Sequence, residues 1–449
     1  MVRSETYICQ ACSYVSAKWS GQCPQCQAWN TLELSQRTVT SSQARRKSSP
    51  AIPLVKLQDV TSAHDTRMTS GYKEWDRVVG GGIVPGAFIV LTGDPGIGKS
   101  TLLLQIAHAL ARSHQTVYIA SEESLAQVKG RAERINCLNT PLLFSDRVQI
   151  DDIVALAEQH KPAVIVIDSI QNCTVADTDS LPGSTHHVRD IAFRCMRLAK
   201  EYNIALLVSG HITKDGNMAG PKTLEHMVDT VLYLQGEDRW QTRVLRSVKN
   251  RFGPIDEIGF FEMEENGLVE LANFNGQVLQ DMSYAPGAVL VSSLEGSRPV
   301  LIEFQALTIA SHFSLPQRLV TGIDQKQVIL IAAILEKYLK IPLNKQDIFF
   351  KVTGGFKIKS NGADLAIALA LLSSYFQTPL PERSVALGEI GLTGQIKPIT
   401  HMNVHINEAR KFGIEKIYIA EQQKVDCSPS YVRRLRTVYD LLSFFPVEQ

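Results

Sequence analysis

The sequence has no apolar run that approaches the roughly 18 residues of a membrane-spanning helix. Its amino terminus also lacks the apolar segment of a secretory signal, so we expect a cytoplasmic protein that does not contact a membrane. The net charge is only +1 over 449 residues, which excludes a global electrostatic attraction to nucleic acid. Any site for a polyanion must therefore be a local patch. The sequence contains no repeat at solenoid or propeller periods.

Cysteine is sparse beyond residue 26, where four scattered residues are expected to be buried thiols and not disulfides: Cys137, Cys173, Cys195 and Cys427. The other four form two CxxC pairs with ten residues between the pairs: Cys9, Cys12, Cys23 and Cys26. Two such pairs complete a tetrahedral thiolate site, which predicts a structural Zn²⁺ with no open coordination position. We expect three aromatic side chains to pack around it: Tyr14, Trp19 and Trp29. A redox-active CxxC pair is the alternative that remains open.

A glycine-rich segment fits the pattern GxxxxGK[ST] without a mismatch: Gly93, Asp94, Pro95, Gly96, Ile97, Gly98, Lys99 and Ser100. An apolar run at 87–92 predicts a strand before it, and residues 101–110, which start at Thr101, predict a helix after it. This context is typical of a phosphate-binding loop, whose backbone N–H groups surround the phosphates. We expect Lys99 to contact the β- and γ-phosphates of ATP and Ser100 to ligate Mg²⁺.

The region around this loop alternates apolar strand-like runs with helical patterns. The runs after the first lie at 116–120, 163–168, 204–209 and 230–234. Short apolar strands separated by helices predict an α/β fold whose mainly parallel sheet is covered on both faces. Asp168 ends one of these strands and is expected to hold the Mg²⁺ shell. Glu122 is our candidate for orienting the attacking water, whereas Glu123 is as consistent with a solvated loop carboxylate.

Together these segments resemble the bacterial RadA/Sms family of DNA-repair ATPases. The resemblance rests on the loop above, the four amino-terminal cysteines, residues 80–87, the segment YIASEES, the pentapeptide KNRFG at 249–253 and GEIGLTGQI at 388–396. It covers essentially the whole chain and implies a RecA-like motor that forms hexameric rings on single-stranded DNA and promotes branch migration of recombination intermediates. It also implies a RecA-type recombinase and a replicative helicase as protein partners.

The resemblance assigns roles to several basic residues. Lys249 and Arg251 are implied to reach a neighbouring subunit's nucleotide or to couple it to DNA, and two residues that are two apart on an extended segment point the same way. His211 stands where RecA-like proteins place a γ-phosphate sensor. A glycine-bearing loop follows it, with Lys214 and Lys222 at its ends, and suits a loop that grips DNA phosphates. Without the resemblance, the pentapeptide also fits a solvated basic turn.

We expect four parts: a C4 zinc finger at 1–30, a linker at 31–58, a RecA-like P-loop ATPase domain at 59–272 and a domain at 273–449. The last part resembles the proteolytic domain of Lon proteases on residues 359–365 and 388–394. The position that matches the nucleophile is Ala363, and the position that matches the lysine falls near Asn403, so the Ser–Lys chemistry is absent. Ser360 is three residues away, in a segment where SNG replaces the family's common EPA. An ATP-dependent Lon-like protease and a nucleotide-driven switch without DNA affinity remain the rival functions.

Overall fold

The computed structural model describes residues 6–9, 14–16, 18–35, 56–59, 67–175, 184–211, 226–236, 242–255, 257–312, 315–428 and 430–446. By its internal contacts the chain divides into two units, Met1–Ser62 and Ala63–Gln449. Each unit is described below by itself. Among the described residues, no helix is long and apolar enough to cross a membrane.

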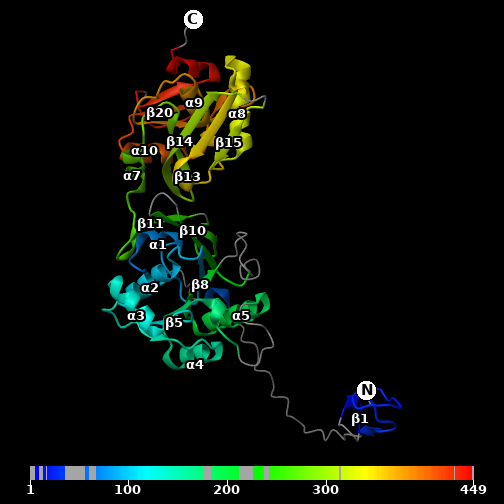
Figure 1. Cartoon of the computed structure of the whole chain (residues 1–449). Coiled ribbons are helices and arrows are strands. Elements are labelled where there is room, and N and C mark those ends of the chain that lie inside the picture. Colours follow the sequence, from blue (N-terminus) through cyan, green and yellow to red (C-terminus); the bar gives the residue numbers. More distant parts are fainter. Residues whose placement is uncertain are drawn as a thin grey trace. The chain divides into compact units, whose positions relative to one another are not determined.

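The amino-terminal unit is a small three-stranded antiparallel sheet in the order β2-β1-β3 (Figure 1). Its strands are β1 (Thr6–Cys9), β2 (Val15–Ser16) and β3 (Leu32–Ser35). Because β3 pairs with β1, the sheet continues to Ser35, beyond residue 30, where the zinc finger was expected to end.

The first part of the second unit is a nine-stranded sheet in the order β12-β11-β10-β9-β4-β8-β7-β5-β6. The strands from β9 to β6 in this order are parallel, and β10 to β12 continue the sheet as antiparallel strands. The strands are β4 (Phe88–Gly93), β5 (Thr116–Ala120), β6 (Leu143–Ser145), β7 (Val164–Asp168), β8 (Ala205–His211), β9 (Thr230–Gly236), β10 (Thr242–Asn250), β11 (Ile258–Glu264) and β12 (Gly267–Glu270).

Helices cover both faces of this sheet, which explains why its central strands are continuously apolar. In β7, Val164 and Val166 join the core that contains residues of α1, α2 and α3, whereas Ile165 and Ile167 join the core on the side of α4 and α5. The helices are α1 (Lys73–Val78), α2 (Lys99–Leu110), α3 (Leu125–Arg134), α4 (Ile150–His160) and α5 (Thr185–Tyr202). The predicted mainly parallel, doubly covered sheet is therefore confirmed.

The second part of this unit contains a mixed seven-stranded sheet in the order β15-β16-β14-β13-β17-β20-β21. These strands are β13 (Ala288–Glu295), β14 (Arg298–Ala310), β15 (Arg318–Thr321), β16 (Gln346–Val352), β17 (Ser384–Leu387), β20 (Lys416–Ala420) and β21 (Val432–Leu435), with a separate hairpin of β18 (Glu389–Ile390) and β19 (Ile396–Lys397). Its helices are α7 (Phe274–Asp281), α8 (Gln325–Leu339), α9 (Asp364–Tyr375) and α10 (Met402–Lys411). The rings of Phe260 in β11 and Phe274 in α7 stack with centroids 4.1 Å apart, so the two sheets share one apolar core.

Candidate functional site: the phosphate loop and its sheet edge

The glycine-rich loop runs from the end of β4 to the start of α2 and has a backbone that only glycine adopts readily. Gly93, Gly96 and Gly98 have φ angles of 152°, 75° and 112°. A Cβ atom on Gly93 would lie 2.2 Å from a backbone carbonyl oxygen of β9, so no side chain fits there. Lys99 begins α2 and is 5% exposed, and its Nζ donates to the carbonyl oxygens of Gly93, at 2.8 Å, and of Asp94, at 2.9 Å. Left-handed glycines that lead directly into a helix start are the features of a phosphate-binding loop.

Asp168 ends β7 at the same edge of the sheet, because parallel strands place their carboxyl ends together. Its two carboxylate oxygens accept separate hydrogen bonds, Oδ2 from the Tyr118 hydroxyl at 2.7 Å and Oδ1 from the Ser209 hydroxyl. Burial and the neighbouring Asp168 charge hold the pKa of Tyr118 well above its ordinary value, so the phenol stays a donor. The two hydroxyls fix the direction of a carboxylate that is 8% exposed.

Glu122 follows β5 by two residues and is exposed. The Ser169 hydroxyl donates to Glu122 Oε1, and Ser169 is itself held because its backbone N–H donates to the Ser121 hydroxyl at 2.6 Å. Glu123 instead forms an ion pair with Arg131. The two adjacent carboxylates are therefore different: Glu122 is held beside Asp168, and Glu123 is bound to α3.

The cation of the loop and the carboxylates interact. Burial lowers the pKa of Lys99, while the charges of Asp168, Glu122 and Asp94 raise it. The structure thus brings these four predicted site residues into one electrostatic environment, although β8 and β7 separate β4 from β5. His211 is the last residue of β8 and pairs in register with Gly93, so its backbone adjoins the loop. Its side chain lies outside the described residues.

The structure describes three of the four cysteines of the predicted zinc site, and Cys12 lies outside the described residues. The Sγ atoms of Cys9, Cys23 and Cys26 all lie within 4.8 Å of one another, and those of Cys9 and Cys26 are 3.6 Å apart. Two thiolates on one tetrahedral zinc stand about 3.8 Å apart, given Zn–S bonds of about 2.3 Å, so the donor set fits this metal.

The packing expected around the zinc site was partly wrong. Tyr14 packs against the small core of Cys9, Cys23 and Leu32. Trp19 and Trp29 are 56% and 70% exposed, because a sheet of three short strands has no interior large enough for two indoles.

Family models match three parts of the chain. A model described as a rubredoxin metal binding domain matches residues 7–33, one described as an AAA domain matches 53–217, and one described as subunit ChlI of Mg-chelatase matches 313–423. Curated relatives span nearly the full length. DNA repair protein RadA of Streptococcus pyogenes serotype M1 is 42% identical over 419 residues, which cover 93% of this chain and 92% of the relative. The protein of the same name from Bacillus subtilis strain 168 is 40% identical, with 92% of both chains covered.

The chain belongs to the RadA family of DNA repair proteins. As a member it is an ATPase of DNA repair with a RecA-like fold, an amino-terminal zinc ribbon and a Lon-like carboxyl-terminal part. Among solved structures, a DnaB-like replicative helicase aligns with a TM-score of 0.40 at 17% identity, covering 46% of this chain and 63% of that one. The RadB recombinase aligns with a TM-score of 0.36 at 21% identity, covering 45% and 99%.

The KNRFG segment of this RadA family member lies at the opposite edge of the sheet. β10 runs antiparallel to β9, so Asn250 pairs with Thr230 at the start of β9, while Arg243 pairs with Gly236 at its end. Lys249 Nζ donates to the Val228 carbonyl oxygen at 2.8 Å. Both basic residues of the pentapeptide are thus at the amino edge of the parallel strands, away from their own phosphate loop.

Arg251 is held there by a buried carboxylate. Its guanidinium lies 3.2 Å from Asp229, which is 2% exposed and also accepts from Lys200 at 2.7 Å and from the backbone N–H of Phe88 at 3.0 Å. Phe252 packs at the margin of the adjacent core. Arg251 itself remains about half exposed, with its side chain 55% accessible, so it can exchange this contact for another anion.

In the Lon-like part, Ala363 is 2% exposed at the start of α9, and Asn403 is exposed on α10. The Ser360 hydroxyl accepts from the backbone N–H of Gly362 at 3.1 Å and acts as a helix cap. Among the described residues, no basic side chain is hydrogen-bonded to this hydroxyl.

Sequence reasoning missed the residues that hold the site together, notably Tyr118, Ser209, Asp229 and Lys200. A tyrosine within a buried strand requires a hydrogen-bond partner, and this was the one available signal for Tyr118. The other three act through contacts between segments that are far apart in the sequence. Lys214 and Lys222, our candidates for DNA contacts, lie outside the described residues.

Proposed function

We propose that this chain is a DNA-dependent ATPase that assembles as a homo-hexameric ring on single-stranded DNA and uses ATP hydrolysis to promote branch migration of recombination intermediates. The observation that carries the proposal is the separation of its two polar sites onto opposite sheet edges. In a head-to-tail ring each interface joins two different surfaces of the subunit, and we propose that these are the amino edge of one sheet and the carboxyl edge of the next. Lys249 and Arg251 then act on a neighbour's nucleotide.

Within one subunit, each residue has a defined task in hydrolysis. Lys99 and the loop N–H groups bind the phosphates, and the Ser100 and Asp168 oxygens are ligands of the kind that Mg²⁺ prefers. Bound Mg²⁺ would supply charge neutralisation on the phosphates. Glu122, positioned through Ser169, orients or deprotonates the attacking water.

Contact with DNA is assigned to the loop after β8. In this proposal His211 senses the γ-phosphate at the carboxyl edge, and Lys214 and Lys222 hold the phosphates of single-stranded DNA. A RecA-type recombinase and a replicative helicase are the proposed protein partners in the repair reaction.

The test is ATP turnover by the purified chain with and without single-stranded DNA, with the mass of the assembly measured under the same conditions. We expect a hexamer, Mg²⁺-dependent turnover, strong stimulation by DNA and ATP-dependent extension of a branched DNA joint. If the rate of ATP turnover is the same with and without DNA, the result would favour a nucleotide-driven binding switch instead.

The rival protease function is tested directly. An unfolded protein substrate incubated with the chain and ATP should remain intact, because Ala363 and Asn403 replace the nucleophile and the lysine. Cleavage that disappears in Ser360→Ala would establish the protease function and contradict our reading of this part.

A further inference from the structure

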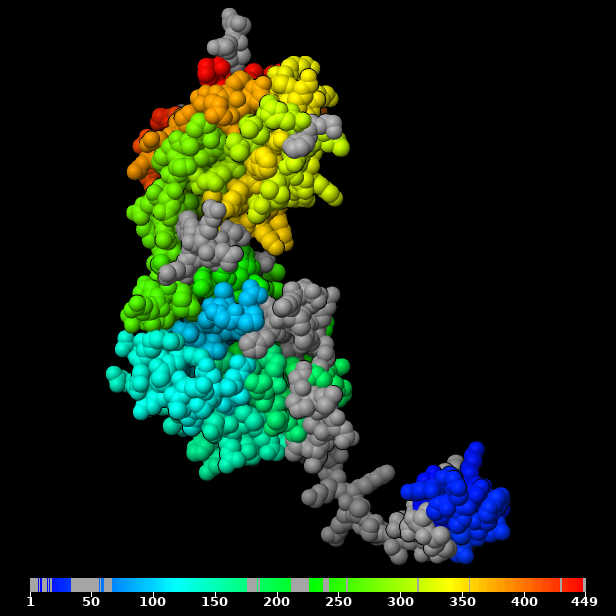
Figure 2. Space-filling view, viewed as in Figure 1, coloured from blue at the N-terminus to red at the C-terminus, as the bar shows by residue number. Residues whose placement is uncertain are grey.

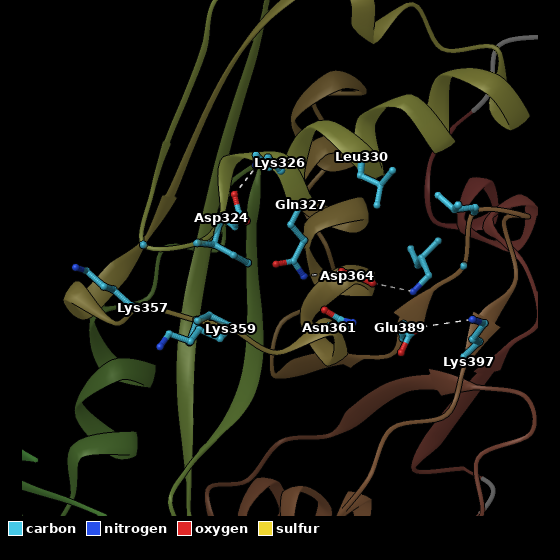
Figure 3. A pocket seen from close by; sticks show the side chains of 16 residues that line it. Asp324, Lys326, Gln327, Leu330, Lys357, Lys359, Asn361, Asp364, Glu389 and Lys397 are labelled. Atoms are coloured by element: carbon cyan, nitrogen blue, oxygen red, sulfur yellow. Dashed lines mark hydrogen bonds and ion pairs between the residues drawn. The ribbon is translucent and has the colours of Figure 1, made fainter. Parts of the chain in front are cut away.

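A cavity of about 790 Å³ lies in the Lon-like part, between the start of α8, the segment at 357–361 and the β18–β19 hairpin (Figure 3). Its volume is in the range of ligand-binding pockets. We propose that this cavity binds a short acidic segment of a partner protein that also carries bulky apolar side chains. The proposal rests on the charges and the apolar surface of the lining, and it is independent of the ATPase site.

The acidic residues of the cavity are already engaged by the protein. Asp324 caps α8 and accepts from a backbone N–H of the helix at 2.9 Å. Asp364 accepts from Gln327 Nε2 at 2.7 Å and from the backbone N–H of Ile390 at 3.0 Å. Glu389 forms an ion pair with Lys397 at 3.4 Å. Figure 3 shows these contacts as dashed lines. These contacts hold the three carboxylates in place, but only Glu389 is paired with a cation. With Lys326, Lys357, Lys359 and Lys397 against these three carboxylates, the lining carries a net charge of +1 (4 − 3).

Three further lysines of the lining are not compensated. Among the described residues, no carboxylate lies within ion-pair distance of Lys326, Lys357 or Lys359. In Figure 3, Lys357 and Lys359 lie at one end of the cavity, whereas Lys326 lies at the start of α8, between them and Leu330. An uncompensated set of lysines at one end of a cavity favours an anionic ligand.

The other end of the cavity carries two exposed leucines beside the Glu389–Lys397 ion pair. Leu330 on α8 and Leu392 in the β18–β19 turn are 45% and 67% exposed, and both line the cavity. α8 lies on the surface of this part of the molecule (yellow in Figure 2). Figure 3 places Leu330 at the end away from Lys357 and Lys359. A ligand that covers both ends must combine negative charge with an apolar group.

The lining fits a peptide better than a nucleic acid. The described residues of the lining include no aromatic side chain on which a base could stack and no arginine fork for a phosphate. Its lysines come from α8 and from the extended segment at 357–359. They are therefore placed to bind several negative charges along a ligand, and not a single phosphate group. Successive aspartates or glutamates followed by a leucine or phenylalanine match this order of lysines and leucines.

The test uses the full chain and a fluorescein-labelled decapeptide with four aspartates followed by leucine and phenylalanine, with binding followed by fluorescence polarisation. We expect saturable binding that Lys357→Glu combined with Lys359→Glu weakens at least tenfold, and that Leu392→Ser weakens several-fold. Lys424→Glu, an exposed lysine elsewhere in the same part, should stay within twofold of wild type. Thermal unfolding and basal ATP turnover check that each variant is folded.

Two control ligands separate the alternatives. The same peptide with asparagine in place of aspartate should not bind, and an oligothymidylate should not displace the acidic peptide. The proposal is overturned if the wild-type chain gives no saturation, or if the Lys357/Lys359 reversal binds as well as Lys424→Glu. Displacement by the oligonucleotide at lower concentration than by unlabelled peptide would identify a nucleic-acid site and also overturn it.

Discussion

Replacing Arg251 by alanine should abolish DNA-stimulated hydrolysis while leaving ATP binding intact. The reason is distance. Arg251 directly follows Asn250, the residue of β10 that pairs with the start of β9. The neighbouring strand β4 runs parallel to β9, and five residues separate its start at Phe88 from the phosphate loop at Gly93. At about 3.3 Å per step, its own phosphate loop is about 17 Å away along the strands. The guanidinium therefore acts on another subunit's nucleotide or on none.

The cost to the fold should be small. The Arg251 side chain is 55% exposed, so solvent screens its contact with the buried Asp229, and we expect a loss of about 1 kcal/mol. Asp229, the buried partner, keeps Lys200 at 2.7 Å and the Phe88 N–H at 3.0 Å after the substitution. A cation that stabilises only the transition state contributes about 10²–10³-fold in turnover. We therefore expect Arg251→Ala to change the free energy of unfolding little and to lower turnover strongly.

The assay measures ATP affinity, assembly mass and turnover with and without single-stranded DNA. Arg251→Ala should match wild type in the first two and lose about 10²–10³-fold in DNA-stimulated turnover; Lys249→Ala should behave alike. Arg197→Ala, whose ion pair with Glu201 lies on the surface of α5, is the control and should remain active. Mixing Arg251→Ala with Lys99→Ala subunits should restore part of the turnover, because each supplies what the other lacks at a shared interface.

Full DNA-stimulated turnover in Arg251→Ala would refute the coupling role. Loss of ATP affinity in that variant would place the guanidinium at its own subunit's nucleotide and contradict the distance argument. Mixed rings that remain as inactive as the separate variants would contradict action between subunits.

Three further predictions concern the supporting residues. Tyr118→Phe removes a hydrogen bond to the buried Asp168 carboxylate, and chemical denaturation should show a free energy of unfolding lower by about 1.5–3 kcal/mol. In the same variant, kcat should decrease by a larger factor than the factor by which KM for ATP changes. Cys9→Ser with Cys12→Ser should lose one zinc per chain by metal analysis, with basal turnover retained; a wild-type chain without zinc would contradict the site. Burial lowers the pKa of His405 to about 4, against about 6.5 in the unfolded chain, so the unfolded state binds the extra proton between these values. Stability should therefore fall by up to about 3 kcal/mol as pH decreases from 6.5 to 4, and His405→Gln should remove this dependence in denaturation at each pH.

The local sequence predicted the boundaries of the helix and strand near the candidate nucleotide site closely. The strand expected at 116–120 is β5 itself, and the helix expected at 101–110 lies within α2, which begins at Lys99. The phosphate loop could be predicted because its glycines and its lysine act over eight consecutive residues. The two CxxC pairs could be recognised in the same way, because each lies within four consecutive residues. The packing expected for Trp19 and Trp29 was wrong because it required an interior that the small sheet does not have.

The sequence by itself determined the family, the doubly covered parallel sheet and the position of the glycine-rich loop, since each depends on a short pattern or on burial along one strand. Tertiary structure alone decided which residues hold Asp168 and Arg251. Tyr118 and Asp168 are 50 positions apart, and Asp229 and Arg251 are 22 apart. These contacts follow from the order and direction of strands in the sheet, and that order depends on how helices cover both faces at once, which no single segment encodes.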